Sequence, residues 1–325
     1  MTESVTCVPI GSIAAASAGP PLVSVIIPAY NASRHLAECL GKVREQVGHF
    51  TLQTLVIDDG SKDSTGEIAR AQPGVECLTQ PNRGPSAARN TGIAAARGEF
   101  IAFLDADDLW PQGKLSAQLG LLMQNPDVAL VAGDCRQFDA RGPWPQTEFA
   151  TSRLGWTASG PGAVVPDGYA RLLENNFITT GSVVVRRAAL ANVGGFDEGL
   201  RLVEDLELWL RIARRYPIGW CTQECLLRRR HAENISRDVE AMGLALLEVL
   251  RRQGTARPGE AGIDVAELTA REQLHLAEIA IAKGGTAAAL RRTWYALTTR
   301  PNPSMLWRAS RLALKAVVRR AAAPR

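Results

Sequence analysis

The segment Phe100-Ile-Ala-Phe-Leu-Asp-Ala-Asp-Asp108 decides how the rest of the chain is interpreted. Its first five residues are apolar and predict a strand that is buried on both faces. Three carboxylates, Asp105, Asp107 and Asp108, follow where this strand must end. Close carboxylates repel one another, so such a cluster is tolerated best when a cation binds to it. The segment therefore indicates a divalent-metal site, and the alternative is a turn in which Asp108 caps the next helix.

Two earlier segments with strand character, Val23–Ile27 and Thr54–Ile57, also end in polar residues. The first is followed by Pro28-Ala-Tyr-Asn31 and the second by Asp58-Asp59-Gly60-Ser61. Helical patterns separate the strands, and this alternation predicts a mostly parallel sheet with right-handed crossovers. Ligands of such sheets bind beyond the carboxyl ends of the strands. We therefore expect the three polar strand ends to lie along one edge of the sheet and to form one site.

The segments between these strands carry helix signals. Asn31 or Ser33 is expected to cap a first helix. The buried stripe of that helix is expected to contain Leu36, Leu40, Val43 and Val47. Ser64 and Glu67 have the spacing of a capping box, which predicts the start of a second helix.

The second half of the chain has a less regular pattern. Residues 140–166 are rich in proline and glycine and are expected to form a long surface loop that faces the acceptor. Ile178–Val185 and Gly219–Arg230 have strand character. Between them, Glu204-Asp205 opens a predicted helix whose apolar stripe includes Trp209.

The composition describes an ordinary soluble chain of 325 residues with 46% hydrophobic and 22% charged residues, enough for one large α/β domain and an appendage. Its six cysteines lack the spacing of a zinc site, and we expect them to be reduced thiols. Residues 1–21 are expected to be a flexible tail rather than a secretory signal, because no Lys or Arg precedes their apolar run. No apolar run is long enough to predict a transmembrane helix.

The C-terminal part of the chain is strongly basic. No Asp or Glu follows Glu278, whereas ten Lys and Arg residues do. On a helical wheel that starts at Leu306, four basic residues fall in one sector: Arg308, Arg311, Lys315 and Arg319. This pattern indicates either a helix at the surface of an anionic membrane or an ordinary amphipathic helix that packs on its own domain. We expect no nucleic-acid partner, because no known binding motif accompanies the basic residues.

Five segments in series resemble the family 2 glycosyltransferases, which are inverting enzymes with a GT-A fold. They are Val23-Ser-Val-Ile-Ile-Pro-Ala-Tyr-Asn31, Val56-Ile-Asp-Asp-Gly-Ser-Lys-Asp-Ser-Thr65, Asn82-Arg-Gly-Pro-Ser-Ala-Ala-Arg-Asn-Thr-Gly92, Phe103-Leu-Asp-Ala-Asp-Asp108, and Glu204-Asp205 with Leu208-Trp209. Each motif alone is weak, but their order and spacing over residues 23–236 agree with the family.

The resemblance implies an α/β fold, a Rossmann-like and mostly parallel sheet flanked by helices, with a C-terminal helical extension. The expected domains are the tail 1–21, a GT-A glycosyltransferase domain 22–237 and a basic helical region 238–325. The implied activity is the transfer of a sugar from a nucleotide-diphosphate donor, with a UDP-sugar favoured, to a glycan or lipid-linked acceptor in polysaccharide biosynthesis. Mg²⁺ or Mn²⁺ is the implied cofactor, and the expected location is cytoplasmic, with peripheral contact at the inner face of the membrane.

The resemblance also implies roles for the donor side of the site. In its DXD motif, Asp107 would be the metal ligand and Asp105 would contact the ribose or share the metal. Asp108 would either support the metal ligands from behind or cap the next helix. A nucleoside pocket would be formed by Pro28, Ala29, Tyr30 and Asp59. Arg83 and Arg89 would meet base, phosphate or a carboxylate, with an ion pair to Asp105 expected for Arg89.

On the acceptor side, the resemblance assigns the catalytic base to Asp205, and the alternative is an acidic residue that stabilises a helix start. Trp209 would stack on an acceptor sugar or, as the pattern slightly favours, belong to the core. His231 would close over the diphosphate and join the metal, and its alternative is a place in the solvated basic run Arg228–Arg230.

Two rival functions use the same residues. A nucleotidyltransferase would share the sheet and the carboxylates, but it would need a glycine-rich phosphate loop where this chain has Pro28-Ala-Tyr-Asn31. A non-catalytic module that binds nucleotide sugars or glycans would lose its base, whereas Glu204-Asp205 is intact. Hydrolysis of the donor in the presence of Mn²⁺ would separate catalysis from binding.

Overall fold

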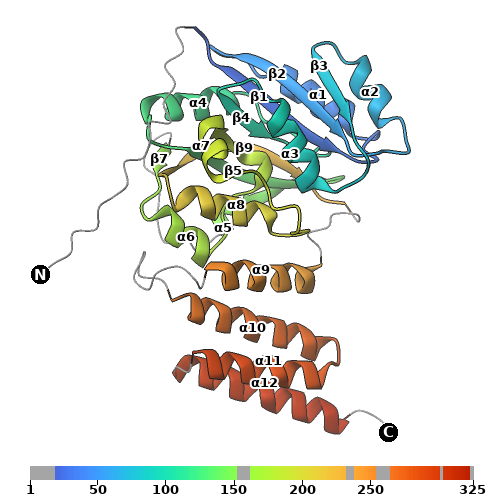
Figure 1. Cartoon of the computed structure of the whole chain (residues 1–325). Coiled ribbons are helices and arrows are strands. Elements are labelled where there is room, and N and C mark those ends of the chain that lie inside the picture. The colour runs from blue at the N-terminus through green and yellow to red at the C-terminus, as the bar shows by residue number, and fades with distance from the viewer. Residues whose placement is uncertain (1–18, 152–161, 232–237, 254–263, 301–302, 323–325) are drawn as a thin grey trace, which may run out of the picture. The chain divides into compact units, whose positions relative to one another are not determined.

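The computed structural model describes residues 19–151, 162–231, 238–253, 264–300 and 303–322 (Figure 1). Their contacts form two compact units. The sheet unit contains the described residues up to 168, together with 177–199 and 204–231. The helical unit contains 169–176, 200–203 and the described residues from 238 onward. All but the last residues of the expected tail 1–21 lie outside the described residues.

The sheet unit is built on a nine-stranded sheet of order β3-β2-β1-β4-β8-β5-β9-β7, with β6 beside β5. The strands are β1 (Leu22–Ala29), β2 (Thr51–Asp58), β3 (Val75–Thr79), β4 (Phe100–Phe103), β5 (Leu130–Asp139), β6 (Gly142–Thr147), β7 (Gly162–Val164), β8 (Val184–Arg186) and β9 (Ile218–Arg229). β1 to β4 run parallel, and so do β5 and β9, whereas β6, β7 and β8 are antiparallel to their neighbours. The prediction of a mostly parallel sheet flanked by helices is confirmed.

Helices cover both faces of this sheet. They are α1 (Leu36–Arg44), α2 (Thr65–Ala71), α3 (Pro85–Ala95), α4 (Lys114–Gln124), α5 (Glu148–Thr151), α7 (Arg187–Val193) and α8 (Glu204–Ala213), with a 3₁₀ turn η1 (Thr180–Ser182). Because side chains alternate along a strand, Val25 and Ile27 of β1 join the core with α1, α2 and α4. On the other face, Ile26 lies against Gly92 of α3, where a Cβ atom would lie 2.4 Å from the isoleucine side chain.

The expected caps of the first two helices differ from those observed. α1 begins at Leu36 after His35, and Asn31, at φ 48°, accepts a hydrogen bond from the backbone of Lys62 instead. Since α1 ends at Arg44, Val47 falls outside the helix and is 74% exposed, so its place in the buried stripe was wrong. Ser64 does precede α2, but without a side-chain cap bond.

The proline-rich segment 140–166 is not one long loop, as we had expected, because it contains β6, α5 and β7 around the undescribed residues 152–161. Pro143 of β6 pairs opposite Phe138, which lies near the end of β5. Proline is tolerated on such an outer strand because no neighbour needs its missing N–H. The strand predicted for 178–185 is also shorter, because η1 replaces its first half and β8 begins only at Val184.

The helical unit contains α6 (Gly168–Glu174), α9 (Val239–Gln253), α10 (Val265–Ala282), α11 (Thr286–Thr299) and α12 (Pro303–Ala322). α10, α11 and α12 share an apolar core that includes Leu274, Ala289 and Leu312. Asp264 caps α10 by accepting a hydrogen bond from the backbone of Glu267 at 3.0 Å. In the part of the chain that the structure describes, no helix is long and apolar enough to cross a membrane.

Candidate active site

The acidic turn after β4 is fixed by backbone hydrogen bonds on both sides. The N–H of Asp108 donates to the carbonyl of Asp105 at 3.0 Å and closes the turn. Immediately after it, Leu109 pairs with Leu227 of β9 through two backbone hydrogen bonds of 3.0 and 2.8 Å. The carboxylates therefore lie on a turn after β4 that is hydrogen-bonded to β9.

Asp108 faces inward from this turn. It is buried, and its carboxylate accepts a hydrogen bond from the backbone N–H of Arg229 at 2.8 Å. Burial and the negative charges of Asp107 and Asp105 raise the pKa of Asp108 well above its usual value. The next helix begins only at Lys114, so the capping role expected for Asp108 was wrong. Its carboxylate instead fastens the acidic turn to β9.

Asp107 meets His231 at the end of β9. Oδ2 of Asp107 and Nε2 of His231 lie 2.7 Å apart, and both side chains are partly exposed. Arg229 also holds the backbone of Asp107, because its Nε donates a hydrogen bond to the carbonyl of Asp107 at 2.8 Å. His35, for which no role is expected from its sequence context, lies with its ring centre 6.2 Å from that of His231. Burial and the charge of Arg229 lower the pKa of His35.

The pair Asp107 and His231 fits a divalent cation that also binds a substrate. Among the described residues, no group of three or more His, Cys, Asp or Glu side chains is arranged to hold a metal ion. Mg²⁺, however, is commonly bound by one or two carboxylates together with the phosphates of a substrate. Asp107 supplies such a carboxylate, which also suits Mn²⁺. The neighbouring imidazole of His231 is likewise reachable from solvent.

Arg89 of α3 joins the acidic turn to the start of α8. Its Nη2 donates to Asp105 and its Nη1 to Glu204, each at 2.8 Å, so the expected ion pair with Asp105 is present. The guanidinium is buried and lies 5.2 Å from the ring centre of Phe196. Burial alone would lower the pKa of Arg89, but the two carboxylates outweigh it and the pKa rises. Burial and the charge of Asp205 raise the pKa of Glu204, against the effect of Arg89.

Asp205 follows Glu204 at the N-terminus of α8. The hydroxyl of Thr180 donates to Oδ2 of Asp205 at 2.8 Å, and Oδ1 accepts from the N–H of Leu206 at 2.7 Å. Thr180 lies on η1, which is anchored by the indole of Trp110 through a 2.8 Å hydrogen bond to the carbonyl of Gly181. A carboxylate held in this way can accept a proton from a hydroxyl group.

Trp209, four residues further along α8, belongs to the core. It is fully buried, and its ring centre lies 6.2 Å from that of Phe103 and 6.0 Å from that of Phe196. The core interpretation of Trp209 is therefore correct, and stacking on an acceptor sugar was not.

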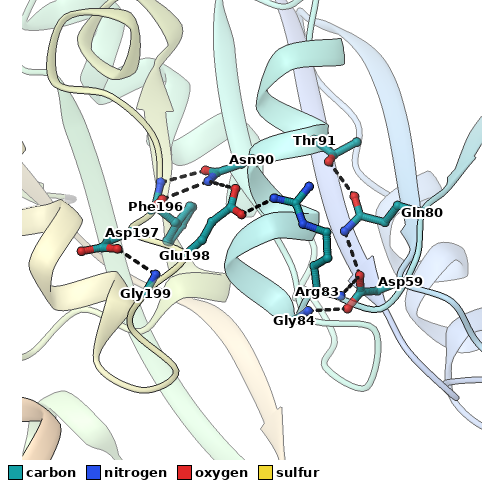
Figure 2. Close-up of polar contacts among 10 residues, drawn as sticks. All are labelled: Asp59, Gln80, Arg83, Gly84, Asn90, Thr91, Phe196, Asp197, Glu198 and Gly199. Carbon is teal, nitrogen blue, oxygen red and sulfur yellow. Dashed lines mark hydrogen bonds and ion pairs between the residues drawn. The ribbon is translucent and has the colours of Figure 1, made fainter.

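Asp59 organises the loop that precedes α3 (Figure 2). Its Oδ1 accepts from the N–H of Arg83 at 3.0 Å and from the amide of Gln80 at 2.8 Å, and its Oδ2 accepts from the N–H of Gly84 at 2.8 Å. Gln80 in turn accepts a hydrogen bond from Thr91 of α3 at 2.6 Å. The carboxylate for which the resemblance implies a nucleoside contact thus already accepts from two backbone donors.

The other residues of the expected nucleoside pocket lie beside Asp59 at the end of β1. Pro28 and Ala29 pair with β2, and the N–H of Asp59 donates to the carbonyl of Ala29 at 2.8 Å. Tyr30 follows directly and is half exposed. The structure therefore brings Pro28, Ala29, Tyr30 and Asp59 together at the carboxyl ends of two neighbouring strands.

Arg83 forms an ion pair with Glu198 and not with a carboxylate of the acidic turn. Its Nη2 is 2.6 Å from Oε2 of Glu198, and both side chains are exposed (Figure 2). Asn90 of α3 bonds to both the N–H and the carbonyl of Phe196 and also donates to Glu198. Asn90 therefore ties α3 to the segment that leads toward α8.

Three residues that bind the predicted site residues were not predicted. Glu204 as a partner of Arg89 had a signal, since it precedes the expected base. Arg229 stood out in the sequence only as part of a basic run. No sequence motif pointed to Thr180, because a single buried hydroxyl belongs to no motif. Their contacts depend on the fold rather than on local sequence.

Comparison with known proteins identifies a matching family and several relatives of this chain. The profile of the family described as Glycosyl transferase family 2 matches residues 24–193. A Bacillus subtilis (strain 168) protein, which bears the name "Putative teichuronic acid biosynthesis glycosyltransferase TuaG", is 27% identical over 219 residues. That match covers 66% of this chain and 81% of TuaG.

Two solved structures share the fold. S. aureus TarS 1-349 in complex with UDP superposes with a TM-score of 0.65 at 17% identity, covering 92% of this chain and 90% of TarS 1-349. The mannosyltransferase PcManGT from Pyrobaculum calidifontis, in complex with GDP-Man and Mn²⁺, superposes with a TM-score of 0.54 at 21% identity. This match covers 94% of this chain and 88% of PcManGT. The mixed, mostly parallel sheet with C-terminal helices thus matches GT-A glycosyltransferases.

Proposed function

The chain belongs to glycosyl transferase family 2 and is a glycosyltransferase, and on this premise we propose its donor, acceptor and chemistry. We propose that it moves a sugar, with inversion, from a UDP-sugar to a hydroxyl group of a glycan or lipid-linked acceptor. A divalent cation, Mg²⁺ or Mn²⁺, assists the transfer.

One observation carries this proposal, namely the bridge that Arg89 makes between Asp105 and Glu204. The first carboxylate belongs to the acidic turn, where a donor would bind, and the second is next to Asp205, the proposed base. A transferase needs a leaving-group site and a base held in a fixed relation to each other. The buried guanidinium supplies that relation across the sheet unit.

The donor side rests on the acidic turn and on the ends of β1 and β2. Asp107 and His231 would hold the cation, and Asp105 would contact the ribose or share the metal. A cation bound there supplies neutralising charge for the diphosphate leaving group. Tyr30 and the backbone ends of β1 would line the nucleoside pocket, with Asp59 shaping it from the adjacent loop. UDP is favoured because TarS, of similar fold, was solved with UDP.

The two arginines have different proposed roles. Arg89 is a positioning residue, because its guanidinium is buried and already bonded to two carboxylates. Arg83 is exposed and paired only at the surface with Glu198, so a bound diphosphate could compete for it. Exposed ion pairs contribute little free energy, which makes such an exchange inexpensive.

The transfer itself is a single displacement. The acceptor oxygen forms a bond to the anomeric carbon while the bond from that carbon to the diphosphate oxygen breaks. Asp205 takes the proton of the acceptor hydroxyl as the new bond forms. Thr180 holds Oδ2 of Asp205, which leaves the carboxylate in one orientation toward the acceptor. The products are the glycosylated acceptor and the nucleoside diphosphate.

The acceptor and the location are proposed from the comparisons and the sequence. The similarity to TuaG supports a glycan of polysaccharide biosynthesis as acceptor. The basic C-terminal region supports work at the inner face of a membrane, in the cytoplasm, where lipid-linked acceptors are presented.

A donor-hydrolysis assay tests the proposal. The purified chain would be incubated with Mn²⁺ and either UDP-sugars or GDP-sugars, and the nucleoside diphosphate released would be measured. We expect release from at least one UDP-sugar, loss of release in Asp205→Asn, and donor binding in both proteins. Binding of a UDP-sugar without release in the wild type, also with glycan acceptors added, would indicate a binding module instead.

A further inference from the structure

Two helices of the helical unit present large apolar side chains to solvent. On α11, Trp294 is 70% exposed and Tyr295 is half exposed. On α12, Trp307 is 64% exposed and Leu314 is 66% exposed. Scattered surface hydrophobes are normal, but several aromatic residues on neighbouring helices indicate a binding surface.

These residues are not the core stripe of their helices. The inward faces of α11 and α12 are already filled by other residues, which include Ala289, Ala296, Met305, Ala309 and Leu312. α12 therefore packs on its own unit, as one of the two sequence interpretations required, and still turns a second apolar face outward. Packing within the unit leaves this outward face unexplained.

The exposed tryptophans of α11 and α12 lie near the same end of a helical hairpin. α11 ends at Thr299 and α12 begins at Pro303, and the two helices pack against each other (Figure 1). At a rise of 1.5 Å per residue, Trp294 lies about 7.5 Å from the end of α11 and Trp307 about 6 Å from the start of α12. Both tryptophans are therefore close to the same end of the hairpin.

Two basic side chains accompany these aromatic residues. The guanidinium of Arg311 lies 4.7 Å from the ring centre of Trp307, and Lys315 is exposed one turn further on. Arg308 and Arg300 pair with Glu278 and Asp264, whereas in the described part of the chain no carboxylate pairs with Arg311 or Lys315. The sequence contains no acidic residue after Glu278.

We propose that this surface, the aromatic-basic face, binds an anionic lipid membrane. It consists of Trp294, Tyr295, Trp307, Arg311, Leu314 and Lys315. Tryptophan and tyrosine favour the headgroup region of a bilayer, and lysine and arginine are attracted to anionic lipids. A second copy of the chain would bring the same uncompensated positive charges together, so an anionic membrane fits the face better.

The proposal is independent of glycosyl transfer and is tested by sedimentation with liposomes. The full-length protein would be mixed with vesicles of phosphatidylcholine alone or with added phosphatidylglycerol, and the bound fraction measured at low and high salt. We expect binding only to the anionic vesicles, and less binding at high salt because the charges are screened.

Two double variants separate the apolar and the charged parts of the face. Trp294→Ser with Trp307→Ser, and Arg311→Ala with Lys315→Ala, are each expected to reduce the bound fraction at least tenfold. The matched controls are Trp144→Ser, which removes an exposed tryptophan of the sheet unit, and Arg251→Ala with Arg252→Ala, which removes the same charge from α9. Both controls should bind like the wild type, and all variants should keep wild-type donor hydrolysis in solution.

Several results would overturn the proposal. They are wild-type sedimentation of both face variants, equal loss in the controls, and equal binding to neutral vesicles. A stable dimer in light scattering that becomes monomeric in Trp294→Ser with Trp307→Ser would instead assign the face to a second copy. Loss of donor hydrolysis with intact liposome binding would count against the proposed function only.

Discussion

Arg89 donates to Glu204 across 2.8 Å, although 115 residues separate them in the chain. The pair is buried, so removing the cation leaves an uncompensated carboxylate beside Asp205. We predict that Arg89→Met lowers the free energy of unfolding by about 3–5 kcal/mol. Urea denaturation at pH 7 measures this change.

Arg89→Met should also lower kcat, in addition to its effect on stability. At a temperature where the variant is folded, kcat should fall more than the donor affinity, because the relation between Asp105 and Asp205 is lost. Arg97→Met provides the control, since it breaks an exposed pair with Glu76 and should change little. Wild-type kcat in a folded Arg89→Met protein would contradict the positioning role.

Asp205→Asn should separate binding from chemistry. An amide cannot take the proton of the acceptor, so transfer should fall by about 100- to 10,000-fold. The affinity for the donor should remain unchanged, as measured by calorimetry with UDP and Mn²⁺. Near-normal turnover in this variant would refute the assignment of the base.

A substitution of Thr180 tests whether its hydrogen bond orients the carboxylate of Asp205. Thr180→Val keeps the shape of the side chain but removes the hydroxyl that donates to Asp205. We expect a lower kcat and a shifted pH profile of kcat in Thr180→Val, whereas Thr180→Ser keeps the hydroxyl and should retain both. Identical pH profiles for the valine and serine variants would show that the hydrogen bond does not orient the base.

Asp107 and His231 should control the effect of the cation. In the wild type, Mn²⁺ together with UDP should raise the melting temperature, because a ligand of the folded state stabilises it. Asp107→Asn and His231→Ala should each reduce this rise, and EDTA should abolish it. Asp127→Asn, which changes an exposed aspartate after α4, should behave like the wild type. A full metal-dependent shift in both site variants would place the cation elsewhere.

Lys114 should make stability depend on pH. Its amine is fully buried and lies 4.2 Å from the ring centre of Trp110, and burial lowers its pKa from 10.5 to about 7, although the nearby thiols of Cys225 and Cys221 act in the opposite direction. Between these two values, the unfolded lysine holds a proton that the folded lysine lacks. Stability should therefore fall as pH decreases toward 7, by up to about 1.4 kcal/mol per unit.

Lys114→Met should remove this slope. Methionine has a similar length and no charge, so the difference between variant and wild type isolates the lysine from the other titrating groups. Urea midpoints at pH 7, 8 and 9 measure the slope, with the exposed Lys42→Met as control. Parallel pH curves for Lys114→Met and wild type would show that the amine remains charged in the folded protein.

The strand ends were the most predictable part of the molecule. Asp58 and Asp105 follow apolar runs that can only be buried strands, and parallel pairing then brings such ends to one edge. The ion pair between Arg89 and Asp105 was also expected, since both residues lie in motifs of known order. Local pattern and topology agree in these segments, which makes them predictable.

Where the structure departs from expectation, long-range contacts decide. The capping role of Asp108 looked reasonable locally, but its carboxylate accepts a hydrogen bond from the backbone N–H of Arg229, which is 121 residues away. Pro143 and Pro145 indicated a loop, yet an outer strand tolerates them. The role of Thr180 could not be predicted from sequence, because its hydroxyl contacts Asp205 only when the fold brings η1 next to α8.

The pairing of Leu109 with Leu227 sets the smallest fragment worth producing. A fragment that ends at residue 193, where the family match ends, would keep the acidic turn but lack β9. Leu109 would lose both backbone partners, and the buried carboxylate of Asp108 would lose the N–H of Arg229. Expression trials should therefore retain every residue through His231, and random truncation libraries should show an abrupt loss of folded protein before that point.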